Sequence, residues 1–243
     1  MRRHVEAEIL DSLAADDPQA RAARRDLVRV HRAMGTLSIL LAAVRGWGVG
    51  RTAPMRVLEL GAGDGSLMLR AATVLAPAWP AVELTLLDRQ ALVTQQTIAD
   101  FAALGWTAVP ITADVLDWAV ERANPTSTAA AAARIDIVLT NLFLHHFTQA
   151  PLRTILQAVT ATTDRFFACE PRRALVALAG SHLIGAIGAT AVTREDAVLS
   201  VHAGFRDREL TAAWPEDATA WRLEEYPARL FSHCFRAQRG DSP

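Results

Sequence analysis

The chain of 243 residues contains no lysine, so all 25 of its basic residues are arginine. This absence excludes a lysine Schiff base, a lysine-anchored pyridoxal phosphate and the lysine of a phosphate-binding P-loop. Cysteine is almost as scarce: Cys169 and Cys234 are far apart and no CxxC pair occurs. A zinc ribbon or a redox dithiol is therefore not expected. Two isolated thiols fit a reducing compartment, and we expect a cytoplasmic location.

An excess of charge of one sign is also missing. The 25 arginines balance 26 acidic residues, and neither sign forms a long run. Surfaces that bind nucleic acid are usually basic, so a nucleic-acid partner is not expected. The seven histidines show no metal-ligand spacing, and the sequence predicts no metal site.

Long hydrophobic runs are absent as well. The most apolar stretch, residues 174–192, is interrupted by Ser181, His182 and three glycines. A bilayer span needs about 20 strongly apolar residues, so we expect a helix that lines a core or cleft, and no membrane span. Charged residues follow Met1, which does not resemble a signal peptide.

The first part of the chain has the periodicity of a helix. Over residues 4–46, apolar side chains from Leu27 to Val44 recur at helical spacing, and glycines at 46, 48 and 50 end the pattern. We expect an N-terminal helical cap over residues 1–50, followed by the main domain over residues 51–243.

From residue 56 the pattern changes to short apolar runs that alternate with helical stretches. The predicted strands are residues 56–60, 82–87, 107–112, 135–140 and 165–170. Strands that alternate with helices indicate βαβ units, and hence a parallel sheet with helices on both faces.

A glycine or a polar residue follows or closes each predicted strand, 26 to 29 residues after the previous one. These five residues are Gly61, Asp88, Asp114, Asn141 and Glu170. One βα unit takes about 30 residues, so all five are expected at the same edge of the sheet. In open α/β sheets this carboxyl edge is where ligands bind.

The remaining segments give weaker signals. Residues 123–134 are of low complexity and predict a surface loop or a helix extension. Helical patterns continue over residues 171–212, including a helix over 193–205 with Thr193 as its N-cap. Two alternating runs within residues 219–238 predict an antiparallel hairpin at the sheet edge.

The sequence "VLELGAGDGS" (57–66) places glycines where a strand passes into a helix. Glycine lets the backbone approach a ligand, although a tight strand–helix turn alone would also use it. A dinucleotide fingerprint GxGxxG requires glycine at 66, where Ser66 stands. The GxGxG spacing, with Glu59 in the preceding strand, resembles motif I of class I S-adenosylmethionine-dependent methyltransferases.

That resemblance implies a fold and a cofactor. The fold is Rossmann-like α/β, with a seven-stranded, mostly parallel sheet that ends in an antiparallel hairpin. The cofactor is S-adenosylmethionine, and the motif implies contacts from the following residues: Glu59, Gly61, Ala62, Gly63 and Gly65.

Acidic residues at the next two strand ends support a nucleoside. Asp88, followed by Arg89, offers an acceptor-only group for both ribose hydroxyls, a device that nicotinamide enzymes share. The resemblance places Asp114 and Val115 beside the adenine. Asp114 is equally suited to cap the helix that begins after it, and the two roles are compatible.

The segment "IDIVLTNLFLHHF" (135–147) resembles motif IV of small-molecule methyltransferases, with Asn141 at the cofactor. Enzymes that methylate nucleic-acid amino groups carry a [DNS]PP[YF] motif here, and this chain has no such proline pair. The flanks, residues 25–35 and 192–205, are similar to bacterial natural-product methyltransferases. In those enzymes a helical cap and a late insertion, here residues 171–212, roof the substrate.

His145 and His146 are the leading acid–base candidates because imidazole titrates near neutral pH. Either could instead be a packing histidine, and adjacent residues cannot face the cleft equally. We favour His146 as the base, because Leu142 and Phe143 indicate that the strand end is still packed, which leaves the later residue nearer the open cleft. Glu170 and Arg172 could also contact substrate, or form a salt-bridged helix start. His31 and His202 are further substrate-contact candidates.

The sequence therefore predicts methyl transfer to a small molecule, most simply to a phenolic or enolic oxygen of a natural product. Carbon methylation, a nicotinamide-dependent oxidoreductase and a non-catalytic S-adenosylmethionine-binding subunit are the alternatives. A homodimer formed through the N-terminal helix is also open.

Overall fold

The computed structural model describes residues 1–123, 134–215 and 220–240. The expectation for residues 123–134 therefore lies almost entirely outside the described residues. All five strands predicted from the apolar runs are present, with bounds shifted by no more than two residues.

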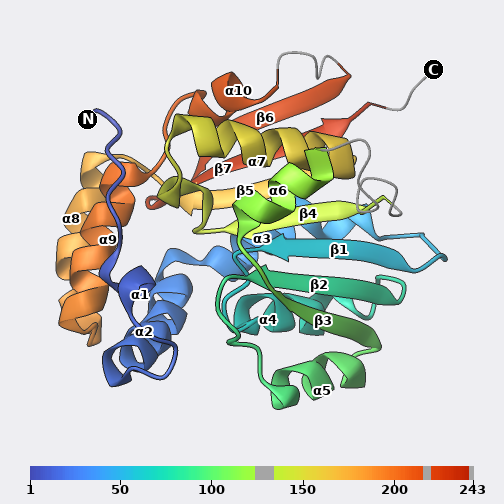
Figure 1. The fold of residues 1–243 in the computed structure, drawn as a ribbon, viewed down its shortest axis with the longest axis horizontal. Helices are drawn as coiled ribbons and strands as arrows, with labels where there is room; N and C mark the ends of the chain where they lie inside the picture. Colours follow the sequence, from blue (N-terminus) through green and yellow to red (C-terminus); the bar gives the residue numbers. More distant parts are fainter. Residues whose placement is uncertain (124–133, 216–219, 241–243) are drawn as a thin grey trace.

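The centre of the molecule is a seven-stranded sheet of order β3-β2-β1-β4-β5-β7-β6 (Figure 1). Five strands are parallel: β1 (Met55–Leu60), β2 (Val82–Asp88), β3 (Trp106–Thr112), β4 (Ile137–Asn141) and β5 (Arg165–Pro171). The predicted hairpin is confirmed as β6 (Trp221–Ala228) and β7 (Ser232–Arg239), and β7 pairs antiparallel with β5.

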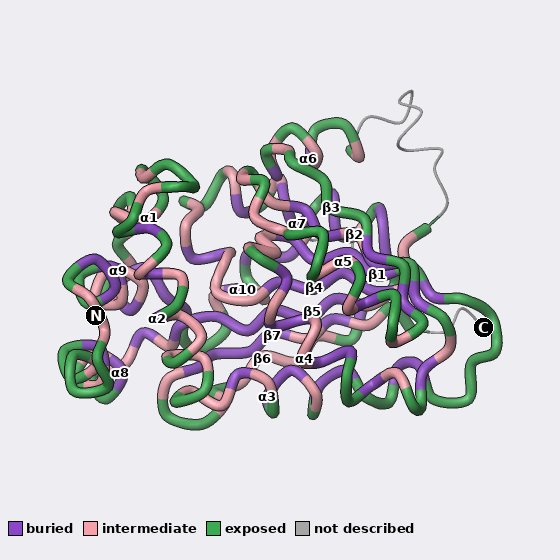
Figure 2. Tube along the Cα trace, turned by 90° about the horizontal axis from the view of Figure 1, so that it is seen from below, coloured by how far each residue is buried: buried purple, intermediate pink, exposed green. Residues whose placement is uncertain are grey.

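Helices cover both faces of this sheet, because each central strand buries side chains on both sides. Apolar residues of α3 (Thr36–Val44), α4 (Ser66–Leu75) and α5 (Gln95–Ala103) pack with Met55 and Val57 on one face. On the other face, α6 (Val115–Ala123), α7 (Gln149–Thr162) and α10 (Glu209–Ala213) pack with Leu58 and Leu60. Figure 2 shows the buried strands between these more exposed layers.

The periodicity of the N-terminal region suggested one helix, but the structure divides the region into several. It consists of the short α1 (Ile9–Ser12), α2 (Pro18–Met34) and α3, and Gly35 breaks the chain between the last two. Gly35 adopts a left-handed φ of 71°, which ends α2, and α3 continues at 64° to it. Because α3 belongs to the core, we place the end of the cap at Gly35 rather than at residue 50.

Between β5 and the hairpin lie α8 (Leu175–Leu183), the short helix η3 (Ile184–Ile187), α9 (Ala191–Ala203) and α10. The N-cap of α9 is Thr190, not Thr193 as the sequence suggested. Thr193 lies inside the helix because α9 starts two residues earlier. Within the described ranges, no single helix is both long and apolar enough to cross a bilayer.

The helices α1, α2, α8 and α9 gather at one end of the sheet, where the parallel strands finish (Figure 1). The chain leaves β1 toward β2 on one side and returns from β3 to β4 on the other, so the strand order reverses between β1 and β4. That reversal is the ligand-binding position of open α/β sheets.

Asp26 of α2 connects the cap to α9. Its carboxylate is 1% exposed and accepts hydrogen bonds from the Thr190 amide (2.6 Å) and the Thr193 hydroxyl (3.0 Å), besides an ion pair with Arg29. Removing the carboxylate leaves those buried donors without an acceptor.

We expect Asp26→Ala to lower the free energy of unfolding by about 1–3 kcal/mol, the usual cost of a buried unsatisfied group. Chemical denaturation measures this difference. Asp16→Ala, at an exposed position nearby, is the control and should change stability little. Equal stability of the two variants would contradict the role assigned to Asp26.

Candidate functional site

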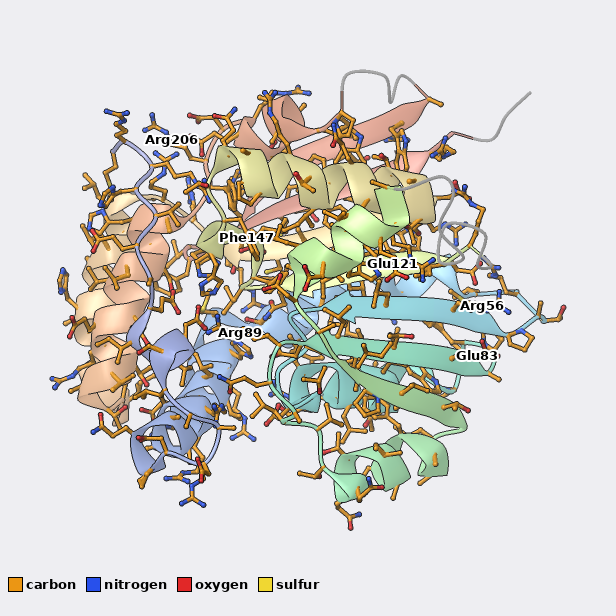
Figure 3. The ribbon with its side chains drawn as sticks, in the orientation of Figure 1. Arg56, Glu83, Arg89, Glu121, Phe147 and Arg206 are labelled. Carbon is orange, nitrogen blue, oxygen red and sulfur yellow. The ribbon has the colours of Figure 1, made fainter. Side chains whose placement is uncertain are left out.

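A cavity of about 880 Å³ lies at the carboxyl edge of the sheet. The loops after β1, β2, β3 and β4 line it from the sheet side, and α1, α2, α8 and α9 line it from the other. Figure 3 shows Arg89 and Phe147 at this end of the strands, with Arg56 and Glu83 at the opposite end. The predicted strand-end cleft is therefore present.

The glycine turn between β1 and α4 forms one wall of the cavity. Gly61 and Gly63 have φ angles of 72° and 57°, a region that favours glycine. A Cβ at Gly61 would collide with the ring of Phe143, whereas a Cβ at Gly63 would meet nothing within 4 Å. Gly61 thus allows close packing onto the loop after β4, and Gly63 leaves open space at the cavity wall.

The carboxylates at the ends of β2 and β3 both line the cavity. Asp88 accepts hydrogen bonds from the amides of Gly63 and Gln90, each at 2.9 Å, so it also fixes the glycine turn. Asp114 accepts from the Leu116 amide at 2.7 Å and so caps α6, as one of its two expected roles required.

Among the described residues that line the cavity, two buried polar atoms have no hydrogen-bond partner. They are Oε2 of Glu59 and Oδ1 of Asn141, and both residues line the cavity. Burial, together with the negative charges of Asp64 and Asp88, raises the pKa of Glu59 to about 8. An unpaired buried acceptor pointing at a cavity is costly unless a ligand donates to it.

Glu170 lies beneath the cavity rather than in its lining, with no exposed surface. Its carboxylate accepts the amides of Phe143, Leu144 and His145 at 2.9–3.3 Å, and Nδ1 of His145 lies 2.9 Å away. These contacts fix the loop after β4, which begins with Leu142 at a left-handed φ of 49°. Glu170 is absent from the cavity lining; its carboxylate accepts the amides at the start of the short helix η2 (Leu144–His146) and pairs with His145.

His145 is 2% exposed and lies between two carboxylates. Nε2 is 3.3 Å from Glu8, opposite the contact of Nδ1 with Glu170. Burial alone would lower the pKa of His145, but hydrogen bonds and ion pairs with Glu170 and Glu8 outweigh it and raise the pKa to about 9. His145 is therefore protonated on both ring nitrogens and positively charged at neutral pH, which disfavours it as a base.

His146 is the more accessible of the two histidines, with 21% of its side chain exposed. Its Nδ1 lies 3.3 Å from Asp11 of α1, which Arg89 also contacts. The relative exposure of the pair agrees with the reason for favouring His146 from the sequence. The partnership with Asp11, 135 positions earlier in the chain, has no signal in the sequence.

The N-terminal segment, residues 3–12, is the part of the site that sequence reasoning missed. Beyond Glu8 and Asp11, Arg3 donates to the carbonyls of Phe147 and Ala203, and the amide of Ile9 donates to Asp196. These are polar contacts, and α1 buries no residue. Extended chain and a four-residue helix give no periodic pattern, which explains the omission.

The other predicted residues are only partly gathered at the cavity. Ala62, Arg89, Val115 and His31 line it, and desolvation there, with the charge of Arg70, lowers the pKa of His31 to about 4. The structure does not bring the following residues into the lining: Gly65, Arg172 and His202. Gly65 instead caps α4, the Arg172 amide donates to the Phe231 carbonyl, and the His202 carbonyl accepts from the His4 amide.

Glu8, His145 and His146 place one ligand atom each within 4.8 Å of one another. Histidine and carboxylate ligands suit divalent transition metals, yet the spacing of these residues along the chain gave no such signal. In this structure Glu8 pairs with His145, which also contacts Glu170, and His146 pairs with Asp11.

The charge on His145 has a consequence for stability. A raised histidine pKa stabilises the fold fully below the unfolded value of 6.5, and this contribution is lost as the pH rises through about 9. We expect the stability difference between wild type and His145→Gln to be largest below pH 6.5 and to shrink toward pH 9.

Denaturation at several pH values between 6 and 10 measures this difference. His4→Gln removes an exposed histidine and should give a small, pH-independent difference. A constant difference for His145→Gln over that range would show that the charge of His145 does not stabilise the fold.

Comparisons with known proteins extend the description of the fold. No protein-family model and no curated protein matches the chain. Among solved structures, an O-methyltransferase family protein from Burkholderia thailandensis is similar with a TM-score of 0.63 and 13% identity. The match covers 97% of this chain but only 64% of that protein, so the chain spans less than two thirds of its length.

Two further structures are similar at comparable identity. The plantazolicin methyltransferase BamL, in complex with a desmethylplantazolicin analogue and S-adenosylhomocysteine, has a TM-score of 0.60 at 13% identity, covering 92% of each chain. The mitomycin 7-O-methyltransferase MmcR has a TM-score of 0.54 at 17% identity, covering 95% of this chain and 60% of that one. Together with the strand order and the hairpin, these likenesses show that the chain has the Rossmann-like class I methyltransferase fold.

Proposed function

We propose that this protein transfers a methyl group from S-adenosylmethionine to a hydroxyl oxygen of a small molecule. The observation that carries the proposal is the cavity at the strand-order reversal, where the glycine turn, Asp88 and the buried acceptors of Glu59 and Asn141 meet. The similar structures support it, because their names describe methyltransferases and one holds S-adenosylhomocysteine.

The charge of the cavity favours this cofactor over a dinucleotide. Besides Glu59, whose raised pKa leaves it protonated at neutral pH, seven acidic residues line it against Arg24, Arg89 and the charged His145. The seven are Glu6, Glu8, Asp11, Asp64, Asp88, Asp114 and Asp196. The pyrophosphate of a nicotinamide cofactor would meet Asp64 and Asp88 beside the glycine turn. A sulfonium cation is attracted to the same surroundings.

The residues present fit S-adenosylmethionine. Glu59 and Asn141 offer unpaired acceptors for its ammonium group, the space beside Gly63 admits a close ligand, and Asp88 offers a carboxylate for ribose hydroxyls. When bound, the cofactor supplies a methyl group on positively charged sulfur, and transfer to oxygen breaks the carbon–sulfur bond and leaves S-adenosylhomocysteine.

His146 is the residue we assign to the acceptor's proton. Asp11 contacts Nδ1 of His146 and so orients the ring, which leaves Nε2 available to the acceptor hydroxyl. His145, already charged, cannot take that proton at neutral pH. Its role is to hold Glu8, and with it the N-terminal segment, against the cavity.

We expect Asp88→Ala to weaken S-adenosylmethionine binding by about 1–3 kcal/mol, because ribose hydroxyls lose a charged acceptor and the glycine turn loses its anchor. Calorimetric titration measures the affinity. Asp117→Ala, an exposed aspartate of α6, is the control. A folded Asp88→Ala protein with wild-type affinity would place the ribose elsewhere, and tight binding of NADH would favour the oxidoreductase alternative.

We expect His146→Ala to lower kcat by about 10²–10⁴-fold while the Kd for S-adenosylmethionine changes little. Asp11→Asn should lower kcat less, since it removes only the orienting partner. Formation of S-adenosylhomocysteine with a panel of phenols gives both the rate and its pH dependence, which should lose one inflection in His146→Ala. Unchanged rates in His146→Ala would exclude it as the base.

The panel of phenols also tests the two remaining alternatives, carbon methylation and a non-catalytic binding subunit. Analysis of the products separates oxygen from carbon methylation, because only the former removes the phenolic hydroxyl. Cofactor binding without turnover on any acceptor would favour a non-catalytic binding subunit.

A further inference from the structure

One side of the cavity lining, here called the apolar lobe, contains neither the residues assigned to the cofactor nor His146. One face of α8 and η3 lines it with small or apolar side chains, Ala177, Gly180 and Ile184. Leu27 and Met34 of α2 and Phe231 of the β6–β7 turn line the remainder. Such walls are typical of sites that bind an apolar ligand body.

Contacts between these elements show that the lobe is built into the fold. The ring of Phe231 packs on Gly180, where a Cβ would lie 2.6 Å from Cε1. Arg229 of the same turn packs on Gly35 at the end of α2 and donates to Ser38 at 2.9 Å. With Asp26 joining α2 to Thr190, these contacts link α2, the hairpin turn and α8 into one wall.

The opening of this lobe is apolar too. Leu183 and Ile187 line the cavity and yet are 69% and 43% exposed. On the outer face of α8, Leu175 is 75% exposed and Val176 is 42% exposed. Exposed apolar groups around a cavity mouth indicate a ligand that continues outward with apolar surface.

The two arginines of the cavity lining are engaged elsewhere. Arg24 donates to the Ala15 carbonyl and to Gln90, and Arg89 donates to the Asp11 carbonyl. The cavity-lining residues of α8 and η3 carry no charge.

We propose that the acceptor is amphipathic, with a hydroxyl-bearing ring at His146 and an apolar substituent that fills the lobe and emerges past Leu183 and Ile187. This inference rests on the proposed function. It adds an apolar substituent to the phenolic or enolic acceptor that the sequence predicts.

Binding of 4-alkylphenols with chains from methyl to octyl, to protein saturated with S-adenosylhomocysteine, tests the proposal by calorimetry. We expect the Kd to fall by about threefold to fourfold for each methylene until the lobe is filled, the value of burying one such group. Turnover with S-adenosylmethionine should show the same trend in KM. A Kd independent of chain length would overturn the proposal.

Two matched variants, one in η3 and one in α8, test whether the alkyl chain binds in the lobe. Ile184→Asp places a charge in the lobe and should abolish the dependence on chain length. Leu175→Asp makes the same kind of change on the exposed face, outside the lining, and should leave the dependence intact. An equal effect of the two variants would overturn the assignment of the lobe.

These measurements distinguish a wrong acceptor class from a wrong proposed function. If S-adenosylhomocysteine binds and short phenols react but chain length has no effect, only the class of acceptor is wrong. If S-adenosylhomocysteine does not bind at all, the proposed function is wrong.

Discussion

The carboxylate of Glu170 is the constraint on which the rest of the site depends. Buried at the end of β5, it accepts the amides of three consecutive residues after β4 and contacts the ring of His145. An ionised carboxylate is stable without water only when such donors surround it. The loop after β4 is thereby fixed, and with it the positions of both histidines and of the Phe143 ring against Gly61.

The site joins two kinds of structure that are stabilised differently. The sheet and its helices are stabilised by apolar burial on both faces. The N-terminal segment is attached by ion pairs and hydrogen bonds to Asp196, Ser200, Arg89 and the two histidines. Several of these contacts are buried, since His145 is 2% exposed and Asp196 is 6% exposed. Opening the segment would leave buried charges unpaired, so the polar contacts fix it against the cavity.

The parts of the fold that follow a regular period could be predicted from the sequence. The five parallel strands, the hairpin and the edge defined by Gly61, Asp88, Asp114 and Asn141 all follow from alternation and spacing, because βα units repeat at nearly constant length. The break at Gly35 was missed because one glycine inside a long periodic segment is also compatible with a continuous helix. Glu8 and Asp11 could not be predicted, since their histidine partners lie more than 130 positions away in the chain.

The long range of these contacts also bears on the order in which the molecule forms. The long-range partners of residues 3–11 lie between Arg89 and Ala203 and are synthesised after them. Contacts between distant positions form late, because closing so long a loop is unfavourable until other interactions have brought its ends together. Residues 3–11 can therefore complete their long-range contacts only after α9 has formed, so this side of the cavity is assembled late in folding.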